Sequence, residues 1–132
     1  MTQTTSTKVQ QQTQEQSPLQ AQAYVLALDI GTSSVRALLF DSAGTAVPNI
    51  NAQHTYSLTI SNEGEVSVDA DMLVDLIAQC IDEVLAAAGP LTSNIKAVAT
   101  DTFWHTLMGV DASGHPVTLA HLGRHPSCQR CC

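Results

Sequence analysis

The segment Asp29-Ile-Gly-Thr-Ser-Ser34 gathers a carboxylate, a glycine and three hydroxyl groups within six residues. Glycine lets a turn adopt positive φ and lets a ligand approach the backbone closely. Successive N–H groups of such a turn form a nest for anions, and hydroxyl groups add donors for phosphate oxygens. This composition predicts that Gly31, Thr32, Ser33 and Ser34 bind phosphate and that Asp29 holds a hydrated Mg²⁺ through water.

The same residues also suit an ordinary Asx-type turn that is capped by its own side chains. Apolar runs at residues 24–30 and 35–40 flank the turn, and both have the length and composition of buried strands. The turn therefore joins two strands in either case, and phosphate binding and a plain turn both remain open at this point.

More strands are expected after this pair. Asp41-Ser-Ala-Gly44 signals a turn, residues 45–60 read as one or two strands broken near Pro48-Asn49, and residues 61–64 form a second turn. Short connections between successive strands predict a three-stranded antiparallel meander.

A helix is predicted next, with Asp69 as its N-cap and Asp71 in its first turn. Gly89-Pro90 ends it. Cys80 falls within the helical pattern and is expected to be a small core residue. The apolar stripe of this helix consists of Met72, Leu73, Leu76, Ile77, Cys80, Ile81, Val84 and Leu85.

Two further strands are predicted after the helix, a buried one at residues 95–100 and another at 107–110, followed by the turn Asp111-Ala-Ser-Gly114. A meander, a helix and then more strands indicate an α/β fold with a mixed sheet.

Composition narrows the classes of function. The chain has 132 residues, is 44% hydrophobic and 13% charged, and carries a net charge of −7. Between residues 23 and 122 only Arg36 and Lys96 oppose eleven acidic side chains, so nucleic-acid binding is not expected. The sequence has no run of about 20 apolar residues and no signal peptide, which predicts a cytoplasmic protein without a membrane partner. Residues 1–22 are rich in Gln and Thr, and we expect a disordered tail.

Three segments, in order, resemble a known family. Asp-Ile-Gly-Thr-Ser-Ser-Val-Arg, followed by an apolar strand and Asp-x-x-Gly, is similar to the first phosphate motif of the sugar-kinase, actin and heat-shock-chaperone ATPases, and most resembles that of the FGGY carbohydrate kinases. Residues 65–73 resemble the segment that leads into the first helix of that family. Residues 95–114 resemble its next strand, sugar-contact segment and turn. The resemblance covers roughly residues 24–120.

The resemblance implies a ribonuclease H-like (actin-like ATPase) N-terminal lobe. It also implies that ATP, with Mg²⁺, donates its γ-phosphate to a hydroxyl of a sugar or sugar acid. Residues 29 and 31–34 would then face the nucleotide, and Trp104 and His105 would lie at the sugar pocket. Core packing of Trp104 and an internal hydrogen bond of His105 are the structural alternatives. Phe103 departs from the polar residue that many members carry, so the resemblance does not fix the sugar.

Two residues near this predicted site keep more than one interpretation. Arg36 either supports the phosphate turn or pairs with a neighbouring carboxylate, and the first is favoured. Asp101, at the end of a predicted strand, either contacts substrate or serves as a cap. In the family, the catalytic base and the adenosine-binding segments come later than residue 132. We therefore expect a truncated lobe without turnover of its own.

The composition of the chain changes in its ending, Leu122-Gly-Arg-His-Pro-Ser-Cys-Gln-Arg-Cys-Cys132, which holds three of the four cysteines. One interpretation is a small, non-catalytic acidic domain with a metal-binding tail; its ligands would be His121, His125, Cys128, Cys131 and Cys132. The favoured interpretation is a frameshift. Codons that encode this ending can be read one base later as Trp-Ala-Asp-Thr-Arg, and Trp-x-Asp-x-Arg resembles what FGGY kinases carry here. The expected divisions are thus residues 1–22, 23–121 and 122–132.

Overall fold

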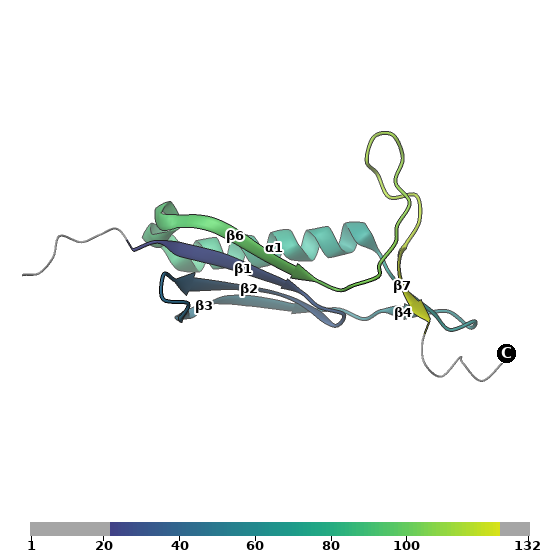
Figure 1. The fold of residues 1–132 in the computed structure, drawn as a ribbon, viewed down its shortest axis with the longest axis horizontal. Coiled ribbons are helices and arrows are strands. Elements are labelled where there is room, and N and C mark those ends of the chain that lie inside the picture. The colour runs from purple at the N-terminus through teal and green to yellow at the C-terminus, as the bar shows by residue number, and fades with distance from the viewer. Residues whose placement is uncertain (1–21, 125–132) are drawn as a thin grey trace, which may run out of the picture.

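A computed structural model describes residues 22–124. These residues form a four-stranded sheet with one long helix on one face, and a small three-stranded sheet lies beyond one end of the large sheet (Figure 1). The predicted tail at residues 1–22 and most of the ending at 122–132 lie outside the described residues. The predicted α/β class with a mixed sheet is confirmed.

The large sheet has the order β3-β2-β1-β6, from β1 (Tyr24–Ile30), β2 (Ser34–Asp41), β3 (Ala46–Thr55) and β6 (Ile95–Thr102). The first three strands form the predicted antiparallel meander, and β6 joins β1 in parallel. Every β1 residue from Tyr24 to Ile30 has a partner on both sides, so β1 lies inside the sheet. The turn that follows it therefore starts from a strand that is held on both edges.

The predicted break near Pro48-Asn49 is an interruption of the pairing with β2 and not an end of the strand, because β3 continues through both residues. Asn49 has a φ of 62° and the pairing with β2 shifts between Leu38 and Phe40, so the strand absorbs the irregularity as a bulge. Proline is tolerated here because β3 is an edge strand of the large sheet.

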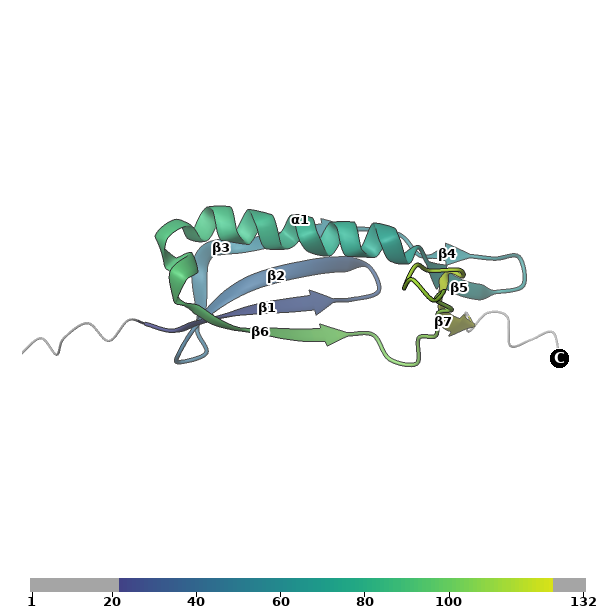
Figure 2. The ribbon, with the colours of Figure 1, turned by 90° about the horizontal axis from the view of Figure 1, so that it is seen from above.

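Helix α1 (Ala70–Ala88) lies along one face of the large sheet (Figure 2). Its stripe packs on alternate strand residues such as Leu26, Val35 and Leu39, which are almost completely buried. Cys80 is fully buried within this core, as predicted, whereas Leu85 is 36% exposed and lies outside it. A short 3₁₀ helix, η1 (Gly89–Asn94), begins at the glycine where α1 was predicted to end.

Asp69 caps α1 as predicted. Its φ of −73° and ψ of 122° are non-helical, and its side chain accepts a hydrogen bond of 3.0 Å from the N–H of Met72. Replacing Asp69 with alanine should lower the free energy of unfolding by about 1 kcal/mol, because a donor in the first turn loses its partner. Urea unfolding followed by circular dichroism measures this loss. The D69N variant keeps an acceptor oxygen and should stay close to the original protein, and an equal loss in both variants would contradict the capping role.

The β6 strand was predicted to be buried, and that expectation is wrong. Strand β6 is an edge strand whose residues after Ile95 are exposed, with Val98 58% accessible. Helix α1 packs chiefly over β2 and β3, so it leaves β6 without a cover. Apolar residues in a sequence run indicated the strand correctly but carried no information on which strand forms the edge.

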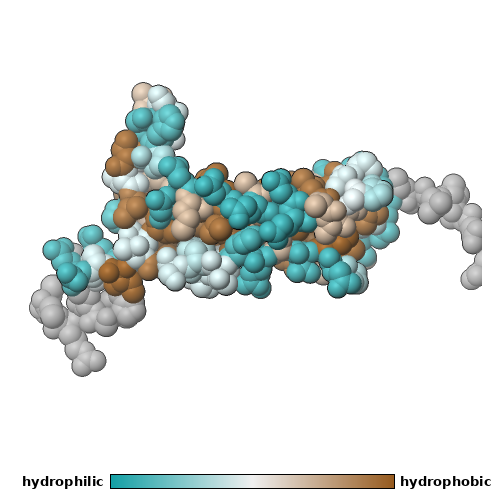
Figure 3. All heavy atoms as spheres, turned by 180° about the vertical axis from the view of Figure 1, so that it is seen from behind, coloured by the Kyte–Doolittle hydropathy of each residue, from teal (hydrophilic) through white to brown (hydrophobic). Residues whose placement is uncertain are grey.

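The small sheet has the order β4-β5-β7, from β4 (Thr59–Ile60), β5 (Glu65–Val68) and β7 (Ala120–Arg124). The strand predicted at residues 107–110 is absent from the described residues, where only isolated bridges join Leu107 to His121 and Val110 to Pro116. Residues 103–119 instead protrude from the body, and the opposite side of the molecule shows both apolar and polar atoms on this protrusion (Figure 3). Among residues 22–124, no helix is both long and apolar enough to span a membrane.

Candidate phosphate turn and substrate pocket

The turn between β1 and β2 is closed by a hydrogen bond of 3.0 Å from the N–H of Gly31 to the carbonyl oxygen of Ser34. Thr32 and Ser33 are exposed at its tip, and Ser34 begins β2. The turn therefore presents hydroxyl groups and backbone N–H groups at the end of the central strand, which is the arrangement that anion binding requires.

Gly31 does not have the positive φ that the sequence predicted, because it is not among the described residues with that conformation. A Cβ atom here would lie 3.4 Å from the carbonyl oxygen of Ser34 and 3.9 Å from Oδ1 of Asp29. Both are ordinary contacts, so the backbone and the neighbouring groups would accept a methyl group at this position, directly beside the carboxylate of Asp29.

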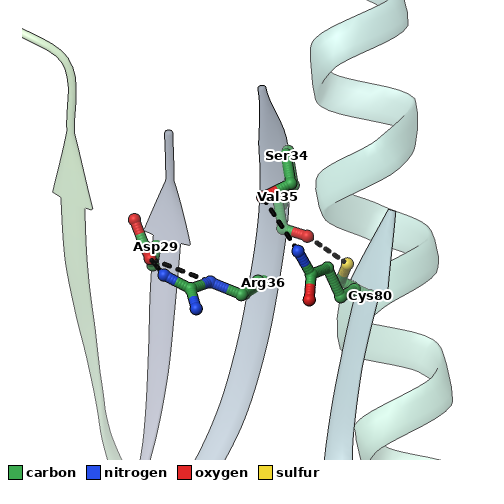
Figure 4. A network of polar contacts seen from close by, with 6 residues as sticks. Asp29, Ser34, Val35, Arg36 and Cys80 are labelled. Atoms are coloured by element: carbon green, nitrogen blue, oxygen red, sulfur yellow. Dashed lines mark hydrogen bonds and ion pairs between the residues drawn. The ribbon is translucent and has the colours of Figure 1, made fainter. Parts of the chain in front are cut away.

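Asp29 forms an ion pair with Arg36, its direct neighbour across β1 and β2 (Figure 4). Arg36 donates from Nε at 3.1 Å and from a terminal nitrogen, both to Oδ2 of Asp29. The pairing alternative for Arg36 is thus what the structure shows. Both side chains are partly open to solvent, with 41% of Asp29 and 48% of Arg36 accessible, so the pair adds little to stability.

The surroundings of Asp29 fit a water-mediated Mg²⁺ contact. Among the described residues, Oδ1 of Asp29 accepts no hydrogen bond from a protein group, and it lies 3.9 Å from the point that a Cβ atom of Gly31 would occupy. Asp101 is its direct neighbour on the other side, in β6. Hard oxygen ligands that retain their waters suit Mg²⁺. No group of three or more potential metal ligands occurs within residues 22–124, so the protein would supply one or two oxygens and phosphate the rest.

The end of β3 contacts the turn through residues that the sequence did not single out. Nε2 of Gln53 donates to Oγ of Ser34 at 3.1 Å, which leaves the hydroxyl hydrogen of Ser34 available to a ligand. The N–H of Tyr56 donates to the carbonyl oxygen of Ser33 at 3.0 Å, and its hydroxyl group donates to the carbonyl oxygen of Gly31. These contacts could have been predicted only from a continuous β3 and its register with β2.

Two groups near the turn have raised pKa values. Burial raises the pKa of the Tyr56 hydroxyl above its ordinary value, so this group stays protonated and able to donate. Burial also raises the pKa of the Cys80 thiol, which donates to the carbonyl oxygen of Val35 at 3.5 Å (Figure 4). A neutral, buried thiol is a core group without nucleophilic character.

Trp104 and His105 follow β6 and differ in their surroundings. Trp104 is 81% exposed, which excludes core packing, and its ring meets that of His105 edge to face with centroids 6.1 Å apart. His105 has a φ of 57° and lines an open, mainly apolar pocket of about 420 Å³. The pocket lies between the first half of α1 and the segment after β6; its lining includes Leu73, Ile77, Phe103 and Met108.

The phosphate turn and this pocket share one end of the large sheet, because β1 and β6 run in parallel and both end there. They lie on opposite faces. Adjacent strand residues point to opposite sides, and Leu28 is buried under α1, so Asp29 points away from the helix, whereas the pocket lies against it. The structure therefore does not bring Trp104 or His105 together with Asp29 in one cavity.

Of the residues proposed as ligands of a metal-binding tail, only His121 lies among the described residues. It is exposed in β7 and pairs with Ser67 of β5. His125, Cys128, Cys131 and Cys132 lie outside the described residues.

A meander followed by a helix and a parallel fourth strand, with a hydroxyl-rich turn at the end of the first strand, is the N-terminal lobe of an actin-like ATPase fold. Solved structures share it. A gluconate kinase from Lactobacillus acidophilus matches with a TM-score of 0.67 and 21% identity, over 76% of this chain and 19% of that one. A xylulose kinase from Brucella ovis matches with a TM-score of 0.69 and 24% identity, over 74% of this chain and 20% of that one.

Sequence comparisons define the family. Residues 24–132 match the model of the N-terminal domain of the FGGY family of carbohydrate kinases. The autoinducer-2 kinase of Yersinia enterocolitica is 33% identical over 94 residues, which are 71% of this chain and 18% of that kinase. The chain therefore belongs to the FGGY family of carbohydrate kinases, and it spans about a fifth of the length of these relatives.

Proposed function

We propose that this chain supplies the phosphate-binding half of an ATP-dependent carbohydrate kinase. In this proposal the turn at residues 31–34 binds the phosphates of Mg·ATP, and Asp29 contacts the magnesium ion through water. The observation that carries the proposal is the turn itself: the exposed Thr32 and Ser33 stand beside the carboxylate of Asp29, whose Oδ1 accepts no hydrogen bond from the described residues. Phosphoryl transfer depends mainly on positioning and on neutralising charge, and this site provides groups for both.

The acceptor in this proposal is a hydroxyl group of a sugar or sugar acid. Similar proteins are named for autoinducer-2, gluconate and xylulose, so the acceptor is proposed as a small polyhydroxylated molecule and no single one is preferred. Trp104 and His105 remain the proposed contacts for this molecule, and the apolar pocket is not assigned to it, because that pocket lies on the face of the sheet opposite Asp29. Transfer also needs a base for the hydroxyl proton, and we propose that residues 1–132 alone bind nucleotide without turnover.

Arg36 has a defined part in this proposal. A guanidinium group that holds only Oδ2 of Asp29 orients the carboxylate and lowers the local negative charge that would repel phosphate. Between residues 23 and 122 it is one of two basic side chains, and Lys96 lies at the start of β6, the opposite end of that strand from Asp101. Phosphate binding by the turn would therefore depend on its own backbone donors, on the metal ion and on Arg36.

The test is the binding of Mg·ATP to the chain with Asp29 replaced by alanine. Isothermal titration calorimetry should show that the original chain binds in a Mg²⁺-dependent manner, and that D29A lowers the affinity at least about tenfold, since it removes the only metal contact proposed here. Asp75, exposed on α1, provides the matched control: D75A removes the same charge and should leave the affinity unchanged. Equal binding by all three proteins, or no binding by the original chain, would exclude the proposal.

A further inference from the structure

Tyr56 is placed just after β3 and makes two hydrogen bonds to the phosphate turn. Its backbone N–H donates to the carbonyl oxygen of Ser33 at 3.0 Å, and its hydroxyl group donates to the carbonyl oxygen of Gly31. One residue therefore holds two carbonyl groups of the turn, on either side of Thr32. The ring packs, partly buried, against the hydrophobic core, which fixes the position of its hydroxyl group.

The planarity of the peptide bond gives these contacts a consequence for the opposite side of the turn. In a trans peptide unit, the C=O of one residue and the N–H of the next point in opposite directions. When the carbonyl group of Gly31 points toward Tyr56, the N–H of Thr32 points away from it. The same reasoning applies to the carbonyl group of Ser33 and the N–H of Ser34.

We infer that Tyr56 is a positioning residue for phosphate: it fixes two peptide planes, so that the N–H of Thr32 points outward to a bound phosphate group while the N–H of Ser34 faces Gly31 across the hairpin. This inference rests on the proposed function of the turn. Tyr56 itself lies behind the turn and touches no ligand. A backbone N–H group aligned in this way can donate to an anion without a lysine or arginine cluster. Because burial raises its pKa, the phenol remains a donor throughout the neutral range.

The Y56F variant tests the inference, because it removes only the hydroxyl group and keeps the ring in the core. Hydrogen exchange of the ligand-free chain should show faster exchange, by about tenfold, at the N–H of Gly31, whose bond to the carbonyl oxygen of Ser34 closes the turn, with the exchange of β1 and α1 unchanged. The affinity for Mg·ATP should fall by roughly three- to tenfold, the loss expected for one neutral hydrogen bond that orders the site.

Tyr24 is the matched control. Its hydroxyl group donates to the side chain of Gln22 at 3.4 Å, at the end of β1 opposite the turn. Y24F should therefore change neither the exchange of the turn nor the affinity. A merely structural role of Tyr56 would raise exchange throughout the sheet and lower the thermal midpoint, and that result, or unchanged exchange at the N–H of Gly31, would overturn the inference.

The two proposals can fail separately. If the original chain does not bind Mg·ATP, the proposed function fails, and the exchange of the turn in the ligand-free Y56F chain still decides whether Tyr56 orders these peptide planes. If the original chain binds and Y56F binds equally well, the phosphate turn stands and the positioning role of Tyr56 is excluded.

Discussion

The G31A variant should bind Mg·ATP at least about tenfold more weakly and yet unfold with an unchanged or slightly higher free energy. The added methyl group would lie 3.9 Å from Oδ1 of Asp29, the oxygen proposed to contact magnesium through water, and would hinder the approach of a metal-bound phosphate. Its contact of 3.4 Å with the carbonyl oxygen of Ser34 is an ordinary one, and Gly31 does not have a positive φ, so the fold accommodates the change. Calorimetry measures the affinity, and urea unfolding measures the stability.

Gly44 provides the control, because its replacement should lower stability and leave binding unchanged. It has a φ of +77° in the turn between β2 and β3, and a Cβ atom there would meet nothing within 4 Å. G44A should lower the free energy of unfolding by about 1 kcal/mol, because the left-handed conformation disfavours a side chain, and should leave binding unchanged. If G31A and G44A behaved alike, a special role of Gly31 in binding would be refuted.

The L39A variant should lower the free energy of unfolding by about 3 kcal/mol or more. Leu39 on β2 is completely buried beneath α1, and truncation would leave a cavity between the sheet and the helix. A small domain has only about 5–15 kcal/mol of stability in total, so a large share of it would be lost. Circular dichroism during urea unfolding is the appropriate measurement, because Trp104 is 81% exposed and reports poorly on the core.

Leu107 allows the same substitution at an exposed position, since 78% of its side chain is accessible. L107A should change the free energy of unfolding by no more than about 0.5 kcal/mol. A similar loss in both variants would mean that residues 103–119 contribute to the core as much as β2 does, contrary to their protruding position.

Much of the fold could be predicted because its signals are local. Alternating apolar residues defined β1 and β2, and Asp69 with the following stripe defined α1. Burial of β6 was mispredicted because it depends on which strands α1 covers, and an apolar run does not contain that information. The strand expected at residues 107–110 is missing because its apolar residues have no neighbouring strand to pair with beyond isolated bridges.

The candidate site could be predicted only in its residue types. Asp29 and the hydroxyl groups follow from six consecutive residues, whereas Tyr56 and Gln53 reach the turn through the register of β2 with β3. The expected break in β3 concealed that register. The positive φ expected at Gly31 was wrong, because the turn closes through its N–H and the carbonyl oxygen of Ser34 without a left-handed residue at that position.

The pairing of β1 also has a consequence for how the chain folds. On one side β1 meets β2, its neighbour in sequence, and on the other it meets β6, with β3, the first strands of the small sheet and α1 between them in the chain. Closing that long loop costs more entropy than forming the hairpin and is the slower step. During synthesis the meander can therefore assemble first, while the other edge of β1 waits for residues 95–102. Throughout that interval the strand that carries Asp29 is open to pairing with other nascent chains.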